Sequence, residues 1–180
     1  MQVVRKHTNS IFNSISYRVG DILIDPGDEW EGFKGVKTVL LTHAHFDHIF
    51  GLNRVIDLNP EAVVITTRFG AKMLSDDKIN LSRYHEIPYR FLYPNHIRIV
   101  EGDETIESGG CNVKVYSTPG HNPSCLTFII GDDIFTGDAY IPGISTVTYL
   151  PFSDKELAAE SLRHIMRLAE GKTIRPGHDL

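Results

Sequence analysis

The stretch that decides the fold is His43–His48, which reads His-Ala-His-Phe-Asp-His and places four metal-ligand side chains within six residues. The apolar run before it, Val36–Leu41, predicts a buried strand. Apolar residues at helical spacing after it predict a helix over residues 49–56. Imidazole and carboxylate groups are ligands that zinc and similar divalent metals accept. The segment therefore predicts a metal site at the end of a buried strand.

The local geometry of this segment directs its side chains to one place. Alternation along an extended chain points His43 and His45 to the same side. The turn into the helix then directs Asp47 and His48 back toward them. A solvated polar loop is the alternative for this segment taken alone.

Three further candidates lie downstream, and each follows a predicted strand and a glycine, which lets backbone segments approach closely. They are His121, Asp138 and His178, preceded by Gly120, Gly137 and Gly177. Taken singly, each would be a turn or cap residue. Together with the first segment they make five histidines and two aspartates. This set exceeds what one tetrahedral zinc needs and suits two metals that share a carboxylate.

The rest of the chain alternates short strands with a few helices. Strands are predicted over residues 14–19, 21–24, 62–66, 97–100, 105–108, 112–117, 126–130, 134–136 and 173–175. A helix is predicted near Phe69–Leu74, and residues 76–96 form a long loop of the kind that covers a site. The capping pattern from Ser153 to Glu156 predicts a last helix with Ser153 at its N-cap. This mixed order favours a sandwich over a doubly wound sheet.

Length and composition limit the class of protein. The chain has 180 residues, of which 41% are hydrophobic and 23% charged, so we expect one globular domain. Its apolar runs fall far short of the roughly 20 residues of a membrane-spanning helix. No apolar segment follows the charged N-terminus as in a secretory signal. Two cysteines are too few for a disulfide framework. We expect a cytoplasmic protein with no membrane partner.

From the Asp25-Pro26-Gly27 turn to His178 the sequence resembles the metallo-β-lactamase fold superfamily. The superfamily's His-x-His-x-Asp-His motif is matched by residues 43–48. The resemblance implies an α+β protein, a four-layer αββα sandwich with its site at one edge of the two sheets. It also implies two divalent metal ions, with zinc expected and iron or manganese as alternatives. The first would be held by His43, His45 and His121, the second by Asp47, His48 and His178, with Asp138 between the two.

Within the superfamily, this ligand set is most similar to glyoxalase II (hydroxyacylglutathione hydrolase) and its small relatives. Asp47 and Asp138 argue against antibiotic hydrolysis, because β-lactamases of this fold lack the first aspartate and usually have a cysteine at the second position. His45 argues against the flavodiiron branch, which has a glutamate there. Glyoxalase II carries a further C-terminal helical part that helps bind glutathione. The chain ends two residues after His178, so we expect a single domain over residues 1–180 and doubt a glutathione substrate.

The resemblance implies a hydrolase that uses a metal-bridging hydroxide to cleave a small ester, thioester or lactone. A metal-bound water has its pKa lowered to roughly 7, which supplies the nucleophile at neutral pH. Asp47 is the expected catalytic residue, which takes up the proton and passes it to the leaving group. We expect Asp25 to hydrogen-bond a ligand histidine. Tyr140 and Tyr149 are candidates for the substrate pocket, with core or rim packing as the alternative.

Other functions and partners stay open at this point. A mononuclear iron enzyme like the persulfide dioxygenases shares the fold, as do phosphodiesterases. The formal net charge of −5 disfavours a nucleic-acid partner, because such proteins carry a basic face. The positive metal cluster suits a small anionic substrate. Loops 76–96 and 139–152, or a second subunit in a homodimer, are the candidates for completing the pocket.

Overall fold

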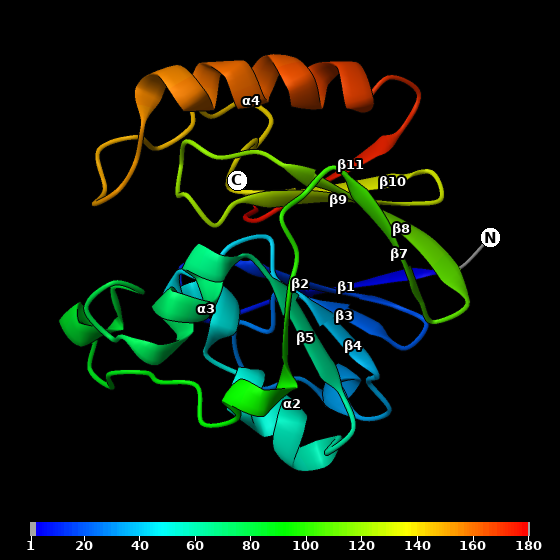
Figure 1. Ribbon diagram of the computed structural model, residues 1–180, viewed down its shortest axis with the longest axis vertical. Coiled ribbons are helices and arrows are strands. Elements are labelled where there is room, and N and C mark those ends of the chain that lie inside the picture. The colour runs from blue at the N-terminus through cyan, green and yellow to red at the C-terminus, as the bar shows by residue number, and fades with distance from the viewer. Residues whose placement is uncertain (1–2, 180) are drawn as a thin grey trace.

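Two β-sheets pack face to face, and helices cover the outer face of each sheet (Figure 1). The structure is a computed structural model, and it describes residues 3–179. Residues 1, 2 and 180, which belong to the domain predicted over 1–180, lie outside the described part. The α+β class and the four-layer αββα sandwich are confirmed by this arrangement.

The first sheet has six strands in the order β1-β2-β3-β4-β5-β6. Its first three strands pair antiparallel, whereas β3 to β6 pair parallel. The connections from β4 to β5 and from β5 to β6 therefore carry helices. The strands are β1 (Val4–Thr8), β2 (Ile15–Val19), β3 (Ile22–Ile24), β4 (Thr38–Leu40), β5 (Val63–Thr66) and β6 (Ile97–Ile99).

The second sheet has five strands in the order β11-β10-β9-β8-β7. Its strands pair antiparallel except for β10 and β11, which are parallel. The strands are β7 (Glu104–Ser108), β8 (Cys111–Ser117), β9 (Leu126–Ile130), β10 (Asp133–Gly137) and β11 (Thr173–Pro176).

The helices fall into two groups on opposite faces of the sandwich. On the outer face of the first sheet lie α1 (Phe46–Ile49), α2 (Leu52–Leu58) and α3 (Arg68–Ser75). On the outer face of the second sheet lies α4 (Lys155–Leu168), at the top of Figure 1. Three short 3-10 turns complete the elements: η1 (Glu31–Phe33), η2 (Ser82–Tyr84) and η3 (Pro94–His96). Across residues 3–179, every helix is too short or too polar to serve as a bilayer span.

Three hydrophobic clusters fill the spaces between these layers. The central one joins the facing sides of the two sheets and includes Leu40, Phe128 and Phe135. A second lies between the first sheet and its helices, and a smaller one joins the second sheet to α4 through Ile134 and Ile165. Each sheet is therefore buried on both faces, which explains why strands such as β9 read as continuous apolar runs.

The helix predicted over residues 49–56 is two helices in the structure. The break falls at Gly51, where a Cβ would lie 2.7 Å from the Phe33 ring and 2.8 Å from the Asp28 carbonyl oxygen. The Gly51 N–H also donates to the Pro26 carbonyl oxygen at 2.8 Å instead of serving the helix ladder. Close contact with the turn after β3 therefore bends the chain at this glycine.

One other prediction needs correction, and one strand was missed. The last helix begins with Asp154, not Ser153, as its N-cap, because Asp154 Oδ1 accepts from the backbone N–H groups of Glu156 and Leu157. Strand β1 was not predicted, since its burial pattern is that of a mostly exposed, polar edge strand.

Candidate metal centre

Strand ends bring the predicted ligands to one end of the sandwich. His43 and His45 follow β4, and Asp47 and His48 lie on the single turn of α1. The remaining three come from the second sheet: His121 lies between β8 and β9, Asp138 directly after β10, and His178 after β11. All seven are at most partly exposed.

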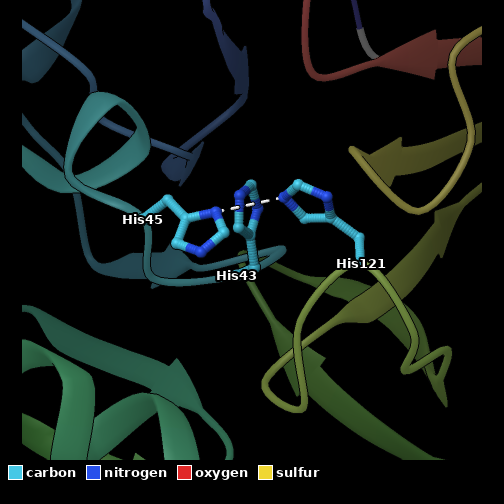
Figure 2. A group of neighbouring side chains, drawn as sticks. All are labelled: His43, His45 and His121. Carbon is cyan, nitrogen blue, oxygen red and sulfur yellow. Dashed lines mark hydrogen bonds between the residues drawn. The ribbon is translucent and has the colours of Figure 1, made fainter. Parts of the chain in front are cut away.

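A first group contains the three imidazoles of His43, His45 and His121, which face one another (Figure 2). Their ring nitrogens lie within 4.8 Å of one another. Nδ1 of His45 is 3.0 Å from Nε2 of His121. His43 faces the same space from the end of β4, and its Nε2 is buried without a hydrogen-bond partner among residues 3–179. Three nitrogen lone pairs therefore converge on one point.

A second group contains Asp47, His48 and His178. Nε2 of His48 is 3.2 Å from Nε2 of His178 and 3.4 Å from Oδ2 of Asp47. Nε2 of His178 is 3.3 Å from the same carboxylate oxygen. This group offers one carboxylate and two imidazoles to a single point.

Asp138 lies between the two groups. Its Oδ2 is 3.3 Å from Nε2 of His178 and 3.7 Å from Nε2 of His121, so one carboxylate oxygen touches both sets. Its Oδ1 is 3.5 Å from Nε2 of His48 and has no hydrogen-bond partner among the described residues. This carboxylate is therefore placed to serve both groups at once.

Hydrogen bonds fix the rings of the histidines by their other nitrogen. The Nδ1–H of His121 donates to the carbonyl oxygen of Val147 at 3.0 Å, and that of His178 to the carbonyl oxygen of Phe12 at 2.9 Å. Such partners set the tautomer and leave Nε2 free to bind a metal. Nothing in the sequence indicates these two partners, because any residue supplies a backbone carbonyl.

Asp25 supports the centre from beneath. Its Oδ2 accepts from the Nδ1–H of His48 at 3.1 Å, and its Oδ1 accepts from the backbone N–H of Thr42 at 2.7 Å. The Thr42 hydroxyl donates to the same carboxylate. Asp25, His43 and His48 also lie close enough to form a third group. We assign Asp25 a supporting position, because its two oxygens already accept these three hydrogen bonds.

Replacing Asp25 by asparagine should weaken metal binding by roughly 10–100-fold, because an amide nitrogen cannot accept a hydrogen bond from His48 or Thr42. Competition titration of the chelator-treated protein with zinc measures this. Asp28→Asn is the matched control, since Asp28 accepts from Ser10 and faces His7 instead of the ligands. Equal zinc affinity in the Asp25 and Asp28 variants would contradict the supporting position.

Two members of the first group, His43 and His45, are electrically neutral. Burial lowers the pKa of His43 well below its ordinary value. Burial, together with the neighbouring His121, lowers the pKa of His45 to about 3. Both imidazoles are therefore unprotonated at neutral pH, which is the form that binds a metal.

The second group stabilises positive charge. Burial alone would lower the pKa of His48, but the carboxylates of Asp47 and Asp138 outweigh it and raise this pKa well above its ordinary value. Burial also opposes protonation of His178, yet the same carboxylates raise its pKa to about 10. Burial raises the pKa of Asp47, but the imidazoles of His48 and His178 have the larger, opposite effect. The net pKa is lowered, so the carboxyl stays ionised. A divalent cation would compete with protons for the same atoms.

These residues fit divalent cations. A buried polar atom without a partner costs about 1–3 kcal/mol, and His43 Nε2 and Asp138 Oδ1 are two such atoms inside the cluster. In a tetrahedral zinc site with Zn–N bonds of 2.0–2.1 Å, ligand atoms lie roughly 3.4 Å apart. Four pairs are separated by 3.0 to 3.5 Å, close to this value: His45 with His121, and His48 with His178, with Asp47 and with Asp138 Oδ1.

Tyr140 and Tyr149, the candidates for the substrate pocket, are not among the residues that line the small cavity beside the centre. Tyr149 is 85% exposed, and Tyr140 packs on the cluster under α4. A cavity of about 20 Å³, room for about one water, lies against His121 and Asp138. It is lined by Ile141, Ile144, Ser145, Thr146 and Val147. The loop over 76–96 contacts α1 through His85, whose ring packs at a tilt against that of Phe46 with centroids 4.9 Å apart.

Comparison with known proteins agrees with this geometry. A profile of the metallo-beta-lactamase superfamily matches residues 19–178. The chain belongs to this superfamily. The resemblance noted from the sequence is thereby confirmed.

Three curated relatives illustrate the range of the superfamily. A probable metallo-hydrolase of Streptococcus pyogenes is 30% identical over 181 residues, which cover 90% of this chain and 77% of the relative. The metallo-beta-lactamase fold-containing protein ST1585 of Sulfurisphaera tokodaii is 29% identical over 72% of this chain and 56% of the relative. A hydroxyacylglutathione hydrolase of Idiomarina loihiensis is 27% identical over 68% of this chain and 42% of the relative. The chain thus spans about half the length of the last two.

Two solved structures share the fold over nearly the whole chain. BLEG-1 B3 metallo-beta-lactamase superposes with a TM-score of 0.90 at 23% identity, covering 99% of this chain and 92% of that one. TTHA1623, solved in a di-iron-bound form, superposes with a TM-score of 0.82 at 25% identity, covering 98% and 92%. The first likeness shows the fold alone.

Proposed function

We propose that the protein is a hydrolase with two divalent metal ions that cleaves a small ester, thioester or lactone. The observation that carries the proposal is the position of Asp138, whose Oδ2 contacts Nε2 of His121 on one side and Nε2 of His178 on the other. A carboxylate that joins two ligand groups is the arrangement that a pair of metals needs.

The ligand assignment follows the two groups. His43, His45 and His121 would hold one metal, and Asp47, His48 and His178 would hold the second, with Asp138 shared. The metals would lower the pKa of a bound water to roughly 7 and polarise the substrate carbonyl. Zinc is our first assignment, because imidazole and carboxylate suit it. Iron is the main alternative, since the similar TTHA1623 was solved with two iron ions.

The chain's own residues would contribute proton transfer and shielding from water. Asp47 is ionised at neutral pH, so its carboxylate is available to take up a proton and return it to the leaving group. The segment from Ile141 to Val147 would exclude bulk water from the reacting atoms, because it leaves space for about one water beside His121 and Asp138.

The proposal includes a location. Cys111 and Cys125 are both free, and burial raises the pKa of the Cys125 thiol. Free thiols fit a reducing compartment, which supports the cytoplasm.

Removing the metals should abolish turnover. We expect treatment with a strong chelator to lower kcat/KM by at least a hundredfold and added zinc to restore it, because the nucleophile depends on the bound cation. Elemental analysis of the purified protein and an assay with ester, thioester, lactone and phosphodiester substrates provide the measurement. His45→Ala is the control for contaminating hydrolases, since it should lose activity in the same preparation.

Each outcome of that experiment has one meaning. Two metals per chain with ester, thioester or lactone cleavage support the proposal. One iron per chain with oxygen consumption would replace it with a dioxygenase, and cleavage of the phosphodiester alone would replace it with a phosphodiesterase. Full activity after complete metal removal would also overturn it.

A further inference from the structure

A second, larger cavity borders the loop that carries His121, and two cationic side chains line it. It has a volume of about 490 Å³, within the range of ligand pockets. Helix α3 contributes Arg68, Phe69 and Lys72 to its wall, and Pro123 comes from the loop that carries His121. We propose that this cavity binds an anionic group of the substrate, a carboxylate or a phosphate, carried on the part that leaves. This inference rests on the proposed hydrolase function.

One residue in the cavity wall, Pro123, is near a candidate metal ligand in the sequence. Pro123 is two residues from His121, so their Cα atoms are at most about 7 Å apart. The same loop is tied to the centre, because the side-chain nitrogen of Asn122 is 3.3 Å from Nε2 of His45. A substrate whose carbonyl lies at the metals therefore needs only a short spacer to reach the cavity.

A second connection runs through the segment after Asp138. The ring of Phe152 packs edge-on against that of Phe69, with centroids 5.5 Å apart. The next residue, Ser153, donates its hydroxyl to the carbonyl oxygen of His121 at 2.8 Å. The wall of the cavity is thus held to the ligand loop from both sides, which fixes the distance between the two sites.

Charge favours an anion here. Arg68 and Lys72 are four residues apart on α3, so they lie on the same face of the helix. Within residues 3–179, the one acidic residue in the wall is Glu101, whose Oε1 is 3.6 Å from an Arg68 nitrogen. This pair is well exposed, at 82% and 74%, and such pairs contribute little energy, so Arg68 can exchange Glu101 for a ligand. The planar guanidinium matches a carboxylate or a phosphate.

Among the described residues, neither lysine nor arginine lines the small cavity against His121 and Asp138. Its wall is formed mainly by Ile141, Ile144 and Val147 with two hydroxyl side chains. An anionic tail would therefore be drawn to Arg68 and Lys72.

The test compares two double variants on three esters. The esters share one acyl group and differ only in the tail of the alcohol, which is uncharged, a carboxylate or a phosphate. Arg68→Glu with Lys72→Glu should raise KM at least tenfold for an ester with a charged tail and leave kcat within about twofold. KM for the uncharged ester should not change. The control is Arg163→Glu with Arg167→Glu, the same charge change at the same spacing on α4.

Salt dependence separates a binding role from a structural one. In the unmodified protein, KM for the charged ester should rise with ionic strength, because exposed charges are screened. That dependence should disappear in the Arg68/Lys72 variant. A rise confined to the carboxylate ester or to the phosphate ester identifies which anion binds. An unchanged KM for both, or an equal rise for all three esters, overturns the inference.

A binding experiment keeps this inference separate from the hydrolase proposal. Calorimetric titration of the chelator-treated protein with inorganic phosphate, and separately with acetate, should show weak binding of at least one anion that is lost in the Arg68/Lys72 variant and kept in the Arg163/Arg167 variant. Equal binding of both anions to all three proteins, or binding of neither to any of them, would overturn the anion site. If no ester is hydrolysed by the metal-loaded protein, the hydrolase proposal fails, while this titration still decides whether the cavity binds an anion.

Discussion

Asp138→Ala should lower kcat by at least a thousandfold and reduce the bound metal from two ions to one. A thousandfold loss corresponds to about 4 kcal/mol of activation free energy. The physical reason is that the Asp138 carboxylate contacts Nε2 of His121, His48 and His178, so it lies between both groups. Its loss would leave the second site with fewer ligands and less negative charge. Elemental analysis and steady-state kinetics measure both effects.

The control for this variant is Asp132→Ala. Asp132 is exposed in the turn before β10, the strand that delivers Asp138 to the centre. The control should keep both metals and full activity. Circular dichroism of the two variants shows whether each is folded. Two bound metals and unchanged turnover in Asp138→Ala would mean that this carboxylate is not shared between metals.

Gly120→Ala should destabilise the fold by about 3 kcal/mol or more and weaken the metal centre as well. A Cβ at this position would lie 2.2 Å from the backbone nitrogen of Ala158 and 2.3 Å from its Cα, so the contact is with the backbone of α4. The φ angle of +134° adds strain for any L residue. Overpacking and backbone strain each cost about 1–3 kcal/mol. His121 is the next residue, so relief of the clash would move a ligand.

Gly131→Ala separates the cost of the contact with α4 from the cost of backbone strain. Gly131 has a φ of +58°, and a Cβ there would meet nothing within 4 Å. It should cost only about 1 kcal/mol, the strain of the left-handed conformation alone. Urea unfolding of the two variants gives the free energies, and zinc titration gives the effect on the centre. Equal destabilisation by the two substitutions would show that the contact with α4 contributes nothing.

Local signals in the sequence predicted the ligand positions. The motif from His43 to His48 is readable because one strand end and one helical turn supply four ligands within six residues. His121, Asp138 and His178 could be named because each follows a predicted strand and a glycine. The structure brings all seven side chains together at one end of the sandwich.

Tertiary contacts overrode local signals in two places. Ser153 and Asp154 are both good N-cap residues. Ser153 uses its hydroxyl to hold the carbonyl oxygen of His121, so Asp154 caps α4 instead. Gly51 divides a helix that periodicity predicts as continuous, because Phe33 and the turn after β3 occupy the space beside it. In both places a distant residue competes for the same atoms or the same space.

By itself, the sequence predicted a sandwich of strands and helices with candidate ligand residues at strand ends, because hydrophobic periodicity and strand-end positions depend on residues near one another in the chain. The four-layer arrangement was an expectation from the resemblance to the superfamily. Only the tertiary structure decided which atoms of these residues face one another and what holds them. The carbonyl oxygens of Phe12 and Val147 and the cavity between α3 and Pro123 belong to this second class. They arise where segments far apart in the chain meet, and a backbone carbonyl has no side-chain signature that a sequence could display.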